Sequence, residues 1–215
     1  MQKKIGLVLL AAILAVAGSA AAQDGRFFIG AMAPQIKFGG SDFNGDNFFD
    51  LDSQFVFIPK VQTAWGWGLL LGYGEDDFDC DFYYMQSKHS ASILTIPESA
   101  DFSAIGINAR WYVSDPGMIR VFLNAAFDFS SLTVTHAAVQ SYEPYQEGNA
   151  RFRGLGICGG CGLSITAFER LTFFAGMEFR WNIMGQVKGY EGEYQNTEDL
   201  DSTGFGFRLG TVFRF

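Results

Sequence analysis

The end of the chain alternates between two kinds of side chain with a period of two residues. One set is apolar apart from a threonine and comprises Phe205, Phe207, Leu209, Thr211, Phe213 and Phe215. The set between them is small or basic apart from a valine and comprises Gly206, Arg208, Gly210, Val212 and Arg214. Because successive side chains of a strand point to opposite faces, this pattern predicts a β-strand with one face in lipid and one in a polar interior.

The same period recurs along the rest of the chain. Alternating segments lie near residues 27–38, 65–73, 78–84, 105–113, 119–129, 155–165 and 171–183, and Pro34 interrupts the first of them. Short turns are expected at residues 75–77, 115–117 and 168–170, and long connections near residues 39–60, 88–100, 131–150 and 186–203. Alternation of short turns with long loops is typical of a membrane-spanning barrel.

The predicted fold class is therefore all-β. We expect a single transmembrane antiparallel up-and-down β-barrel of eight strands, whose even number leaves both termini on the periplasmic side. Ten strands are the alternative if the segment from Phe55 to Val61 forms a strand of its own. An aromatic content of 16%, with 23 Phe, supports the barrel, because a soluble sandwich would rarely place so many Phe side chains outward.

The first residues indicate export. Lys3 and Lys4 precede an apolar run from Ile5 to Ala17 that ends in small residues, which is the pattern of a removable signal peptide. Cleavage after Ala22 would leave residues 23–215 as one barrel domain. No apolar stretch of about 18 residues follows, so helical membrane spans are not expected.

The terminal strand also resembles the assembly signal of bacterial outer-membrane barrels. Arg208, Gly210, Phe213 and Phe215 match its pattern of a polar residue, a glycine, a hydrophobic residue and a terminal aromatic. Together with the strand pattern, this makes the chain similar to the OmpA/OmpX-type barrel domains. The resemblance implies location in the cell outer membrane and recognition of the last strand by the barrel assembly machinery.

Alternate positions of the predicted strands place charged residues in the lumen. They comprise Asp79, Asp81, Arg110, Arg120, Asp128, Glu178, Arg180, Arg208 and Arg214. The interior of an eight-stranded barrel is just wide enough to be filled by side chains, so we interpret this set as a structural network of ion pairs. The functional alternative is a narrow conduction path or gate.

No catalytic, cofactor or metal site is predicted. Cys158 and Cys161 stand three residues apart on a strand, so their side chains face opposite sides and cannot readily bridge. His89 and His136 are the two candidate bases, and both fall in expected external loops, where a solvated histidine is the simpler interpretation. The stretch after His89 does not match the His-any-Ser pattern of the outer-membrane lipid deacylases. We therefore expect a protein that is not an enzyme.

The expected partners lie in and around the membrane. The precursor carries a net charge of −8. Loss of Lys3 and Lys4 removes two positive charges and gives the mature chain a net charge of −10, which disfavours binding to nucleic acid. The aromatic residues expected at the lipid interfaces are Trp65, Trp67, Tyr73, Tyr84, Trp111 and Trp181. The acidic residues expected in loops, where surface ligands or divalent cations could bind, are Asp42, Asp46, Asp50, Asp52, Glu191, Glu193, Glu198, Asp199 and Asp201.

These features favour a structural or surface-interaction role for a barrel with a lumen filled by paired charges and long acidic external loops. The first alternative is a narrow porin or transporter for small or apolar solutes, similar to the OmpW-type barrels, because inward glycines such as Gly156, Gly160, Gly162 and Gly206 could leave space. The second alternative, an outer-membrane lipid-modifying enzyme, requires a base and a nucleophile that spacing does not reveal.

Overall fold

The computed structural model describes residues 26–40, 42–51, 54–114, 116–140, 146–168 and 170–215. Within these ranges the chain forms eleven β-strands. They are β1 (Arg26–Ile36), β2 (Phe48–Leu51), β3 (Gln54–Phe57), β4 (Lys60–Val61), β5 (Ala64–Gly74), β6 (Phe78–Ile93), β7 (Ile96–Tyr112), β8 (Ile119–Gln140), β9 (Glu147–Phe168), β10 (Leu171–Lys188) and β11 (Gln195–Arg214). No helix in the described part of the chain is long and apolar enough to cross a membrane.

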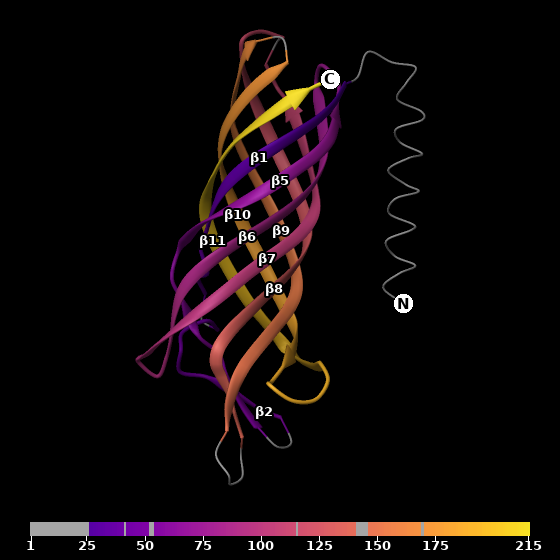
Figure 1. The fold of residues 1–215 in the computed structure, drawn as a ribbon. Helices are drawn as coiled ribbons and strands as arrows, with labels where there is room; N and C mark the ends of the chain where they lie inside the picture. Colours follow the sequence, from indigo (N-terminus) through magenta and orange to yellow (C-terminus); the bar gives the residue numbers. More distant parts are fainter. Residues whose placement is uncertain (1–25, 41, 52–53, 115, 141–145, 169) are drawn as a thin grey trace.

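Eight of the strands close into a ring, which confirms the predicted antiparallel barrel (Figure 1). The ring runs β1, β5, β6, β7, β8, β9, β10 and β11, and each strand pairs with the next in antiparallel register. Pairing of β1 with β11, from Phe28 opposite Arg214 to Pro34 opposite Arg208, closes the ring. Closure leaves no free sheet edge in the wall, as a strand structure in lipid requires.

The three remaining strands lie outside the ring, so the ten-strand alternative is wrong. The hairpin of β2 and β3 adds to the far end of β8 through Gln54, Phe55 and Val56, and β4 pairs with the far end of β6. The segment from Phe55 to Val61 therefore belongs to the connection between β1 and β5. Pro34 has no partner on β5, consistent with its missing N–H group.

An apolar belt surrounds the wall on its outer face. Its side chains are the outward set that the alternation predicts, for example Leu69, Ile107, Phe127, Ile157 and Phe207, each between 44% and 54% exposed. The tryptophans predicted for the interfaces point outward, and Trp65 and Trp67 are about half exposed at one border of the belt while Trp111 lies near the other. Exposed apolar side chains on this scale fit a lipid environment.

The two ends of the barrel differ in length. At one end, called the turn end here, the connections from β5 to β6, from β7 to β8 and from β9 to β10 are short, and Phe215 N–H donates to the Phe27 carbonyl at 2.9 Å. At the other, the extension end, the expected long loops near residues 88–100, 131–150 and 186–203 are mostly strand. β6 and β7, for example, continue to a two-residue turn at Leu94 and Thr95, both with positive φ.

The physical reason is an inversion of polarity along each strand. Within the belt, β6 turns Phe82 and Tyr84 outward and Asp79 and Asp81 inward. Beyond Tyr84 its outward residues are polar, at Lys88, Ser90 and Ser92, while Ala91 and Ile93 are buried inside. The period of two continues, so the ladder continues into water, and the expectation of loops was wrong because it treated loss of the apolar outer face as the end of the strand.

An apolar core fills the extension end of the barrel. Phe38 and Phe43, from the connection after β1, enter the barrel mouth and pack with Phe102 of β7 and Phe152 of β9, with ring centroids 5.3–6.2 Å apart. All four side chains are at most 5% exposed. The interior is therefore plugged at this end by aromatic packing.

Inward glycines make room for aromatic rings in the membrane-spanning half. The Phe122 ring lies over two of them, because a Cβ added at Gly162 would stand 2.5 Å from Phe122 Cζ and one added at Gly176 would stand 3.3 Å from it. The glycines therefore hold rings against the wall instead of leaving an open path.

This packing predicts a position-dependent cost of adding a methyl group. We expect Gly162→Ala to lower the free energy of unfolding by about 1–3 kcal/mol, because the methyl group overlaps both the Phe122 ring and the Ala175 carbonyl. Gly159→Ala on the same strand is the matched control, since its Cβ would meet only the Asn124 carbonyl, at 3.9 Å. Urea unfolding of both variants in detergent micelles measures the difference. Equal stability of the two variants would contradict the packing argument.

Candidate functional site

Nine predicted lumen residues all project inward from the ring strands. Two come from β6, one from β7, two from β8, two from β10 and two from β11, in the order Asp79, Asp81, Arg110, Arg120, Asp128, Glu178, Arg180, Arg208 and Arg214. Seven are buried, and Arg120 and Arg214 near the turn end are partly buried. The alternation of each strand places them inside, and the shear of the barrel sets which of them meet.

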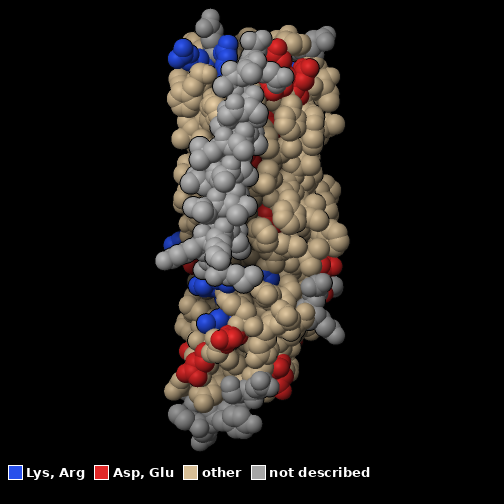
Figure 2. All heavy atoms as spheres, turned by 90° about the vertical axis from the view of Figure 1, so that its right-hand side faces the viewer, with Lys and Arg blue, Asp and Glu red and all other residues tan. Residues whose placement is uncertain are grey.

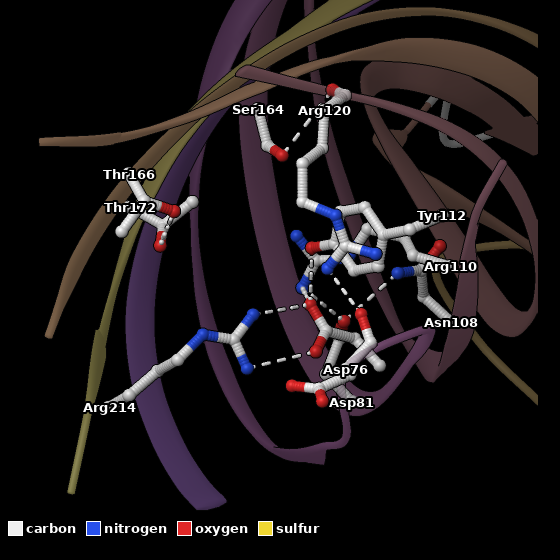
Figure 3. A network of polar contacts seen from close by, with 11 residues as sticks. Asp76, Asp81, Asn108, Arg110, Tyr112, Arg120, Ser164, Thr166, Thr172 and Arg214 are labelled. Atoms are coloured by element: carbon white, nitrogen blue, oxygen red, sulfur yellow. Dashed lines mark hydrogen bonds and ion pairs between the residues drawn. The ribbon is translucent and has the colours of Figure 1, made fainter. Parts of the chain in front are cut away.

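Asp79 is the centre of the layer nearest the turn end. Figure 3 shows Arg110, Tyr112 and Arg214, which belong to the same layer. Arg214 donates to both of its carboxylate oxygens, at 2.8 and 3.0 Å, and the Tyr112 hydroxyl donates to Oδ2 at 2.7 Å. Arg110 lies between Asp79 and Asp81, with Nη2 3.8 Å from the first carboxylate and 2.9 Å from the second. Asn108 donates to the same Asp81 oxygen at 2.9 Å. Two carboxylates and two guanidinium groups thus neutralise one another in a buried layer.

A second layer lies deeper in the barrel. Arg180 binds both oxygens of Asp128, at 2.8 and 3.2 Å, and the Tyr83 hydroxyl donates to Asp128 Oδ2 at 2.5 Å. Arg208 and Glu178 form the remaining pair, with Nη2 and Oε2 2.6 Å apart. A bidentate guanidinium with a third donor is the geometry that compensates best for taking a carboxylate out of water.

Arg120 stands apart from both layers, at the turn-end mouth. Its partners are the Asp76 carbonyl and the Asp77 carboxylate, the latter at 3.3 Å and with its side chain 81% exposed. Its guanidinium lies 4.1 Å from the centre of the Tyr112 ring. The residue therefore joins the turn between β5 and β6 to the lumen, rather than pairing inside it.

Aromatic rings pack against the guanidinium groups in both layers. Arg110 lies 4.9 Å from the Phe174 ring centre, Arg214 lies 5.2 Å from that of Phe28, and Arg180 lies 5.6 Å from that of Phe102. Cation–π contact in a desolvated site adds to each ion pair and fixes the plane of the guanidinium.

Little free volume remains between the layers. A cavity of about 10 Å³ borders Asp81, Arg110, Glu178 and Arg208, which is room for about one water molecule. Asp81 Oδ1 and the Nε atoms of Arg110 and Arg208 are buried there without a protein hydrogen-bond partner. The cavity between the layers can hold water, but it is too small for a substrate.

The three cysteines form no disulfide in the described part of the chain. Cys158 is buried inside the barrel, Cys161 is exposed on the outside, and Cys80 is partly exposed on β6; all three are free thiols. This confirms that the two cysteines of the C-G-G-C sequence face opposite sides. Among the described residues, no three His, Cys, Asp or Glu side chains are grouped so that they could hold a metal ion.

His89 lies inside the barrel, which corrects its assignment to a solvated loop. It is 3% exposed and packs against Phe38 and Phe102 in the apolar core. Its Nδ1 is 2.7 Å from the Gln62 carbonyl, which can only accept, so Nδ1 carries the proton and Nε2 accepts from Ser87 Oγ at 2.7 Å. Burial lowers the pKa of His89, although the Gln62 carbonyl and Asp101 oppose the shift. The pair links the connection after β1 to β6.

His136 is exposed on β8, as expected for a surface histidine. Its backbone has a φ of 48° at an irregularity between β8 and β9, and its Nδ1 is 3.0 Å from Glu98 Oε2. The Thr135 hydroxyl donates to the same oxygen at 2.5 Å. This cluster connects the extended parts of β7 and β8.

The acidic residues of the extension end include contacts between distant connections. The Asp201 N–H of β11 donates to the Asp42 carboxylate at 2.8 Å, and the Asp46 N–H donates to Asn44 Oδ1 at 2.9 Å. The prediction that Asp201 lies in a loop is wrong, because Asp201 belongs to β11 and pairs with Ile183 of β10. Asp52 and the side chains of Glu198 and Asp199 lie outside the described part of the structure.

The residues of the expected assembly signal divide between the two faces of β11. Arg208 points inward to Glu178, and Gly210 lies beside the Phe174 ring. Phe213 and Phe215 point outward, are 41% and 66% exposed, and stack edge to face with centroids 5.4 Å apart. Half of the motif thus contributes to the interior, and recognition by assembly machinery stays a prediction.

The sequence analysis did not identify several side chains that contact the charged groups or His89. Tyr83 and Tyr112 share the inward parity of the charged residues on β6 and β7, so this signal could have identified them as lumen donors. Ser87 and His89 also share one parity, but the contact of His89 with the Gln62 carbonyl depends on where the connection after β1 packs. No local sequence pattern fixes that position.

The ion-pair network predicts unequal effects of two similar substitutions. Asp128→Asn leaves the buried Arg180 without its charged partner, so we expect a loss of about 3–5 kcal/mol in the free energy of unfolding. Asp77→Asn removes an equal charge from an exposed pair and should cost less than about 1 kcal/mol. Urea titrations in the same micelles compare them, and a loss at Asp77 as large as that at Asp128 would count against the burial argument.

His89 predicts a pH dependence of stability. Its folded pKa is below the unfolded value, so the unfolded chain takes up a proton first as pH falls below about 6.5, and stability declines from there until the folded ring also protonates. We expect His89→Gln to flatten this decline relative to the native chain. His136→Gln, which leaves the Ser87–His89 contact in place, should retain it. Unfolding free energies measured between pH 8 and pH 5 test the assignment, and an unchanged slope in His89→Gln would refute it.

Comparison with known proteins finds likeness in structure alone. No family model matches the sequence, and no curated protein matches it. Among solved structures, Neisserial surface protein A superposes with a TM-score of 0.54 at 16% identity, covering 90% of this chain and 100% of that one. The outer membrane protein OprG from Pseudomonas aeruginosa gives a TM-score of 0.56 at 11% identity, covering 89% and 96%.

A third solved structure extends the comparison to another organism. A major outer membrane protein from Thermus thermophilus gives a TM-score of 0.51 at 10% identity, with 90% of this chain and 100% of that chain covered. At sequence identities this low, the structural similarity establishes a shared fold but not a shared function. With its closed ring of eight antiparallel strands and its apolar belt, the chain has the fold of the small bacterial outer-membrane β-barrel proteins.

Proposed function

We propose that this protein is a non-enzymatic barrel of the bacterial outer membrane with a structural or surface-interaction role. The turn end faces the periplasm and the extension end faces the cell exterior, as the asymmetry of short turns and long extensions indicates. The observation that carries the proposal is the filled interior. Two layers of ion pairs occupy the membrane-spanning half, and aromatic packing around Phe38 and Phe102 closes the outer half.

The packing of the lumen argues against the transporter alternative. A conduction path needs continuous space, and the cavity between the charged layers holds about one water molecule. The inward glycines that could have left space are covered, since a Cβ at Gly156 would meet the Asp128 carboxylate, and one at Gly162 would meet the Phe122 ring. These glycines are therefore part of the filling.

Among the described residues, the Ser87–His89 contact is a geometric counterpart of the enzyme alternative. The neutral ring accepts from the serine hydroxyl, as in the nucleophile and base of a serine hydrolase. Both side chains are only 3% exposed, and Phe38 and Phe102 pack against the histidine. A substrate carbonyl has no route to the hydroxyl, which supports a tethering role for this pair.

The outer parts of the strands supply the surface for interaction. β8 and β9 remain paired far beyond the belt, through Val139 opposite Glu147, and β2 and β3 add a hairpin to their rim. Regular hydrogen bonding makes this end a rigid platform whose tips carry acidic side chains such as Asp50 and Glu191. A partner therefore meets a preorganised surface.

Conductance across a planar bilayer tests the proposal. We expect the mature chain, refolded in detergent and shown to migrate differently on a gel before and after boiling, to give no channel steps. Glu178→Ala should also remain silent while lowering stability, because it removes the partner of the buried Arg208. Glu193→Ala, which removes an exposed carboxylate, is the matched control. Reproducible steps from the native chain would replace the structural role with transport.

A further inference from the structure

Basic side chains gather on the outer wall where the apolar belt ends. On the face in Figure 2, Lys and Arg side chains lie at both borders of the largely uncharged belt, and carboxylates lie at the turn end and also beyond the basic side chains toward the extension end. Three basic residues at this level are neighbours across two strands: Arg151 and Arg153 of β9 and Lys188 of β10, called the rim patch here. Their clustering contrasts with the acidic tips of the same end.

Strand register defines the patch closely. Arg153 lies opposite Gln186 on β10 and Ser131 on β8, and Arg151 lies opposite Lys188 and Thr133. Side chains directly opposite in an antiparallel pair have Cβ atoms about 4.5–5.5 Å apart, so Arg151 and Lys188 can bind one group together. Arg153 is two residues beyond Leu155, the last apolar outward residue of β9, or about 7 Å along the strand.

Local contacts hold the two arginines in place. Arg153 lies over the Tyr194 ring, 4.0 Å from its centre, and Arg151 Nε donates to the Thr133 hydroxyl at 3.2 Å. Within the described ranges, no carboxylate forms an ion pair with any member of the patch. On the neighbouring strands, register places Asp101 across Thr133 from Arg151 and Asp201 across Ile183 from Leu155. Among the side chains that the structure describes, the patch therefore presents positive charge without an ion-pair partner.

An apolar hollow lies directly below the patch. This concavity of about 900 Å³ on the outer wall is bordered by Ile105, Phe129, Leu155 and Ile183 on the belt side and by Arg153 and Gln186 on the water side. It forms because Ser103, Ser131 and Gly185 place small groups between large ones. An apolar floor beneath a basic rim matches an amphiphile that has an acyl chain and an anionic head.

We propose that the rim patch and the hollow below it bind a phosphorylated lipid of the outer leaflet. The lipid phosphate contacts Arg151, Arg153 and Lys188, whose planar and point charges suit a phosphate group, and an acyl chain lies over Phe129 and Leu155. The inference rests on the proposed membrane location, with the extension end toward the cell exterior. The proposal assigns a specific lipid-binding site to one part of the outer wall, whereas the rest of the belt contacts lipid without specificity.

Lipid retention by the full mature chain tests the proposal. The refolded protein is titrated in detergent with dimyristoyl phosphatidic acid, and bound lipid is counted by native mass spectrometry. The triple variant Arg151→Gln, Arg153→Gln, Lys188→Gln should bind this lipid at least about tenfold more weakly. The control variant Lys37→Gln, Lys60→Gln, Lys88→Gln removes the same charge from other positions of the extension end and should stay within about twofold of the native chain.

Further arms separate the possible outcomes. Dimyristoyl phosphatidylcholine should show no difference between the two triple variants, because its positive headgroup neutralises the phosphate. Inorganic phosphate that competes as well as the lipid would assign the patch to free anions and overturn the lipid site. Equal losses in both triple variants would reduce the effect to net charge and also overturn it. Gel migration before and after boiling checks first that each variant is folded, so failure to form the barrel is distinguished from failure to bind lipid.

Discussion

The requirement that every backbone polar group in lipid finds a partner governs this structure. A sheet meets it only by closing, and here closure depends on seven paired positions between β1 and β11, from Phe28 opposite Arg214 to Pro34 opposite Arg208. Pro34 donates no hydrogen bond and still lies in this seam, facing β11 at the end of the paired stretch. Once eight strands close, the radius of the barrel is set, and with it the volume that inward side chains must fill.

That narrow interior explains why glycine and arginine occur together on the inner face. A Phe ring such as Phe122 fits only where the neighbouring strands present Gly162 and Gly176, and each guanidinium must meet a carboxylate in the same layer. Arg110 contacts both Asp79 and Asp81, and Arg214 completes the charge balance of the layer through Asp79. The same inward side chains therefore determine both the packing and the charge balance of the lumen. The cavity that remains between the two charged layers has room for about one water molecule.

Sequence alternation predicts the parity of a residue but not its partner. It places Asp128 and Arg180 inside because each lies at an inward position of its own strand, and the structure has both there. Their pairing depends on the stagger among β8, β9 and β10, which no single segment encodes. His89 shows the limit most clearly. Its neighbours Lys88 and Ser90 are polar, so local composition indicated a solvated loop, while its parity on an extended β6 buries it beside Phe102.

The inversion of polarity along the strands connects these observations to the cell surface. Since the period of two continues past the belt on strands such as β6 and β9, the membrane border is marked there by the residue at which the outward set changes from apolar to polar, such as the step from Leu155 to Arg153 on β9. The inner face changes in the opposite sense, from ion pairs to Phe102 and Phe152. Water outside and an apolar core inside keep the extension end folded without lipid, as in a soluble sheet. The border itself is the one level where an apolar wall and cationic side chains adjoin, so it is where the barrel can distinguish one amphiphile from another.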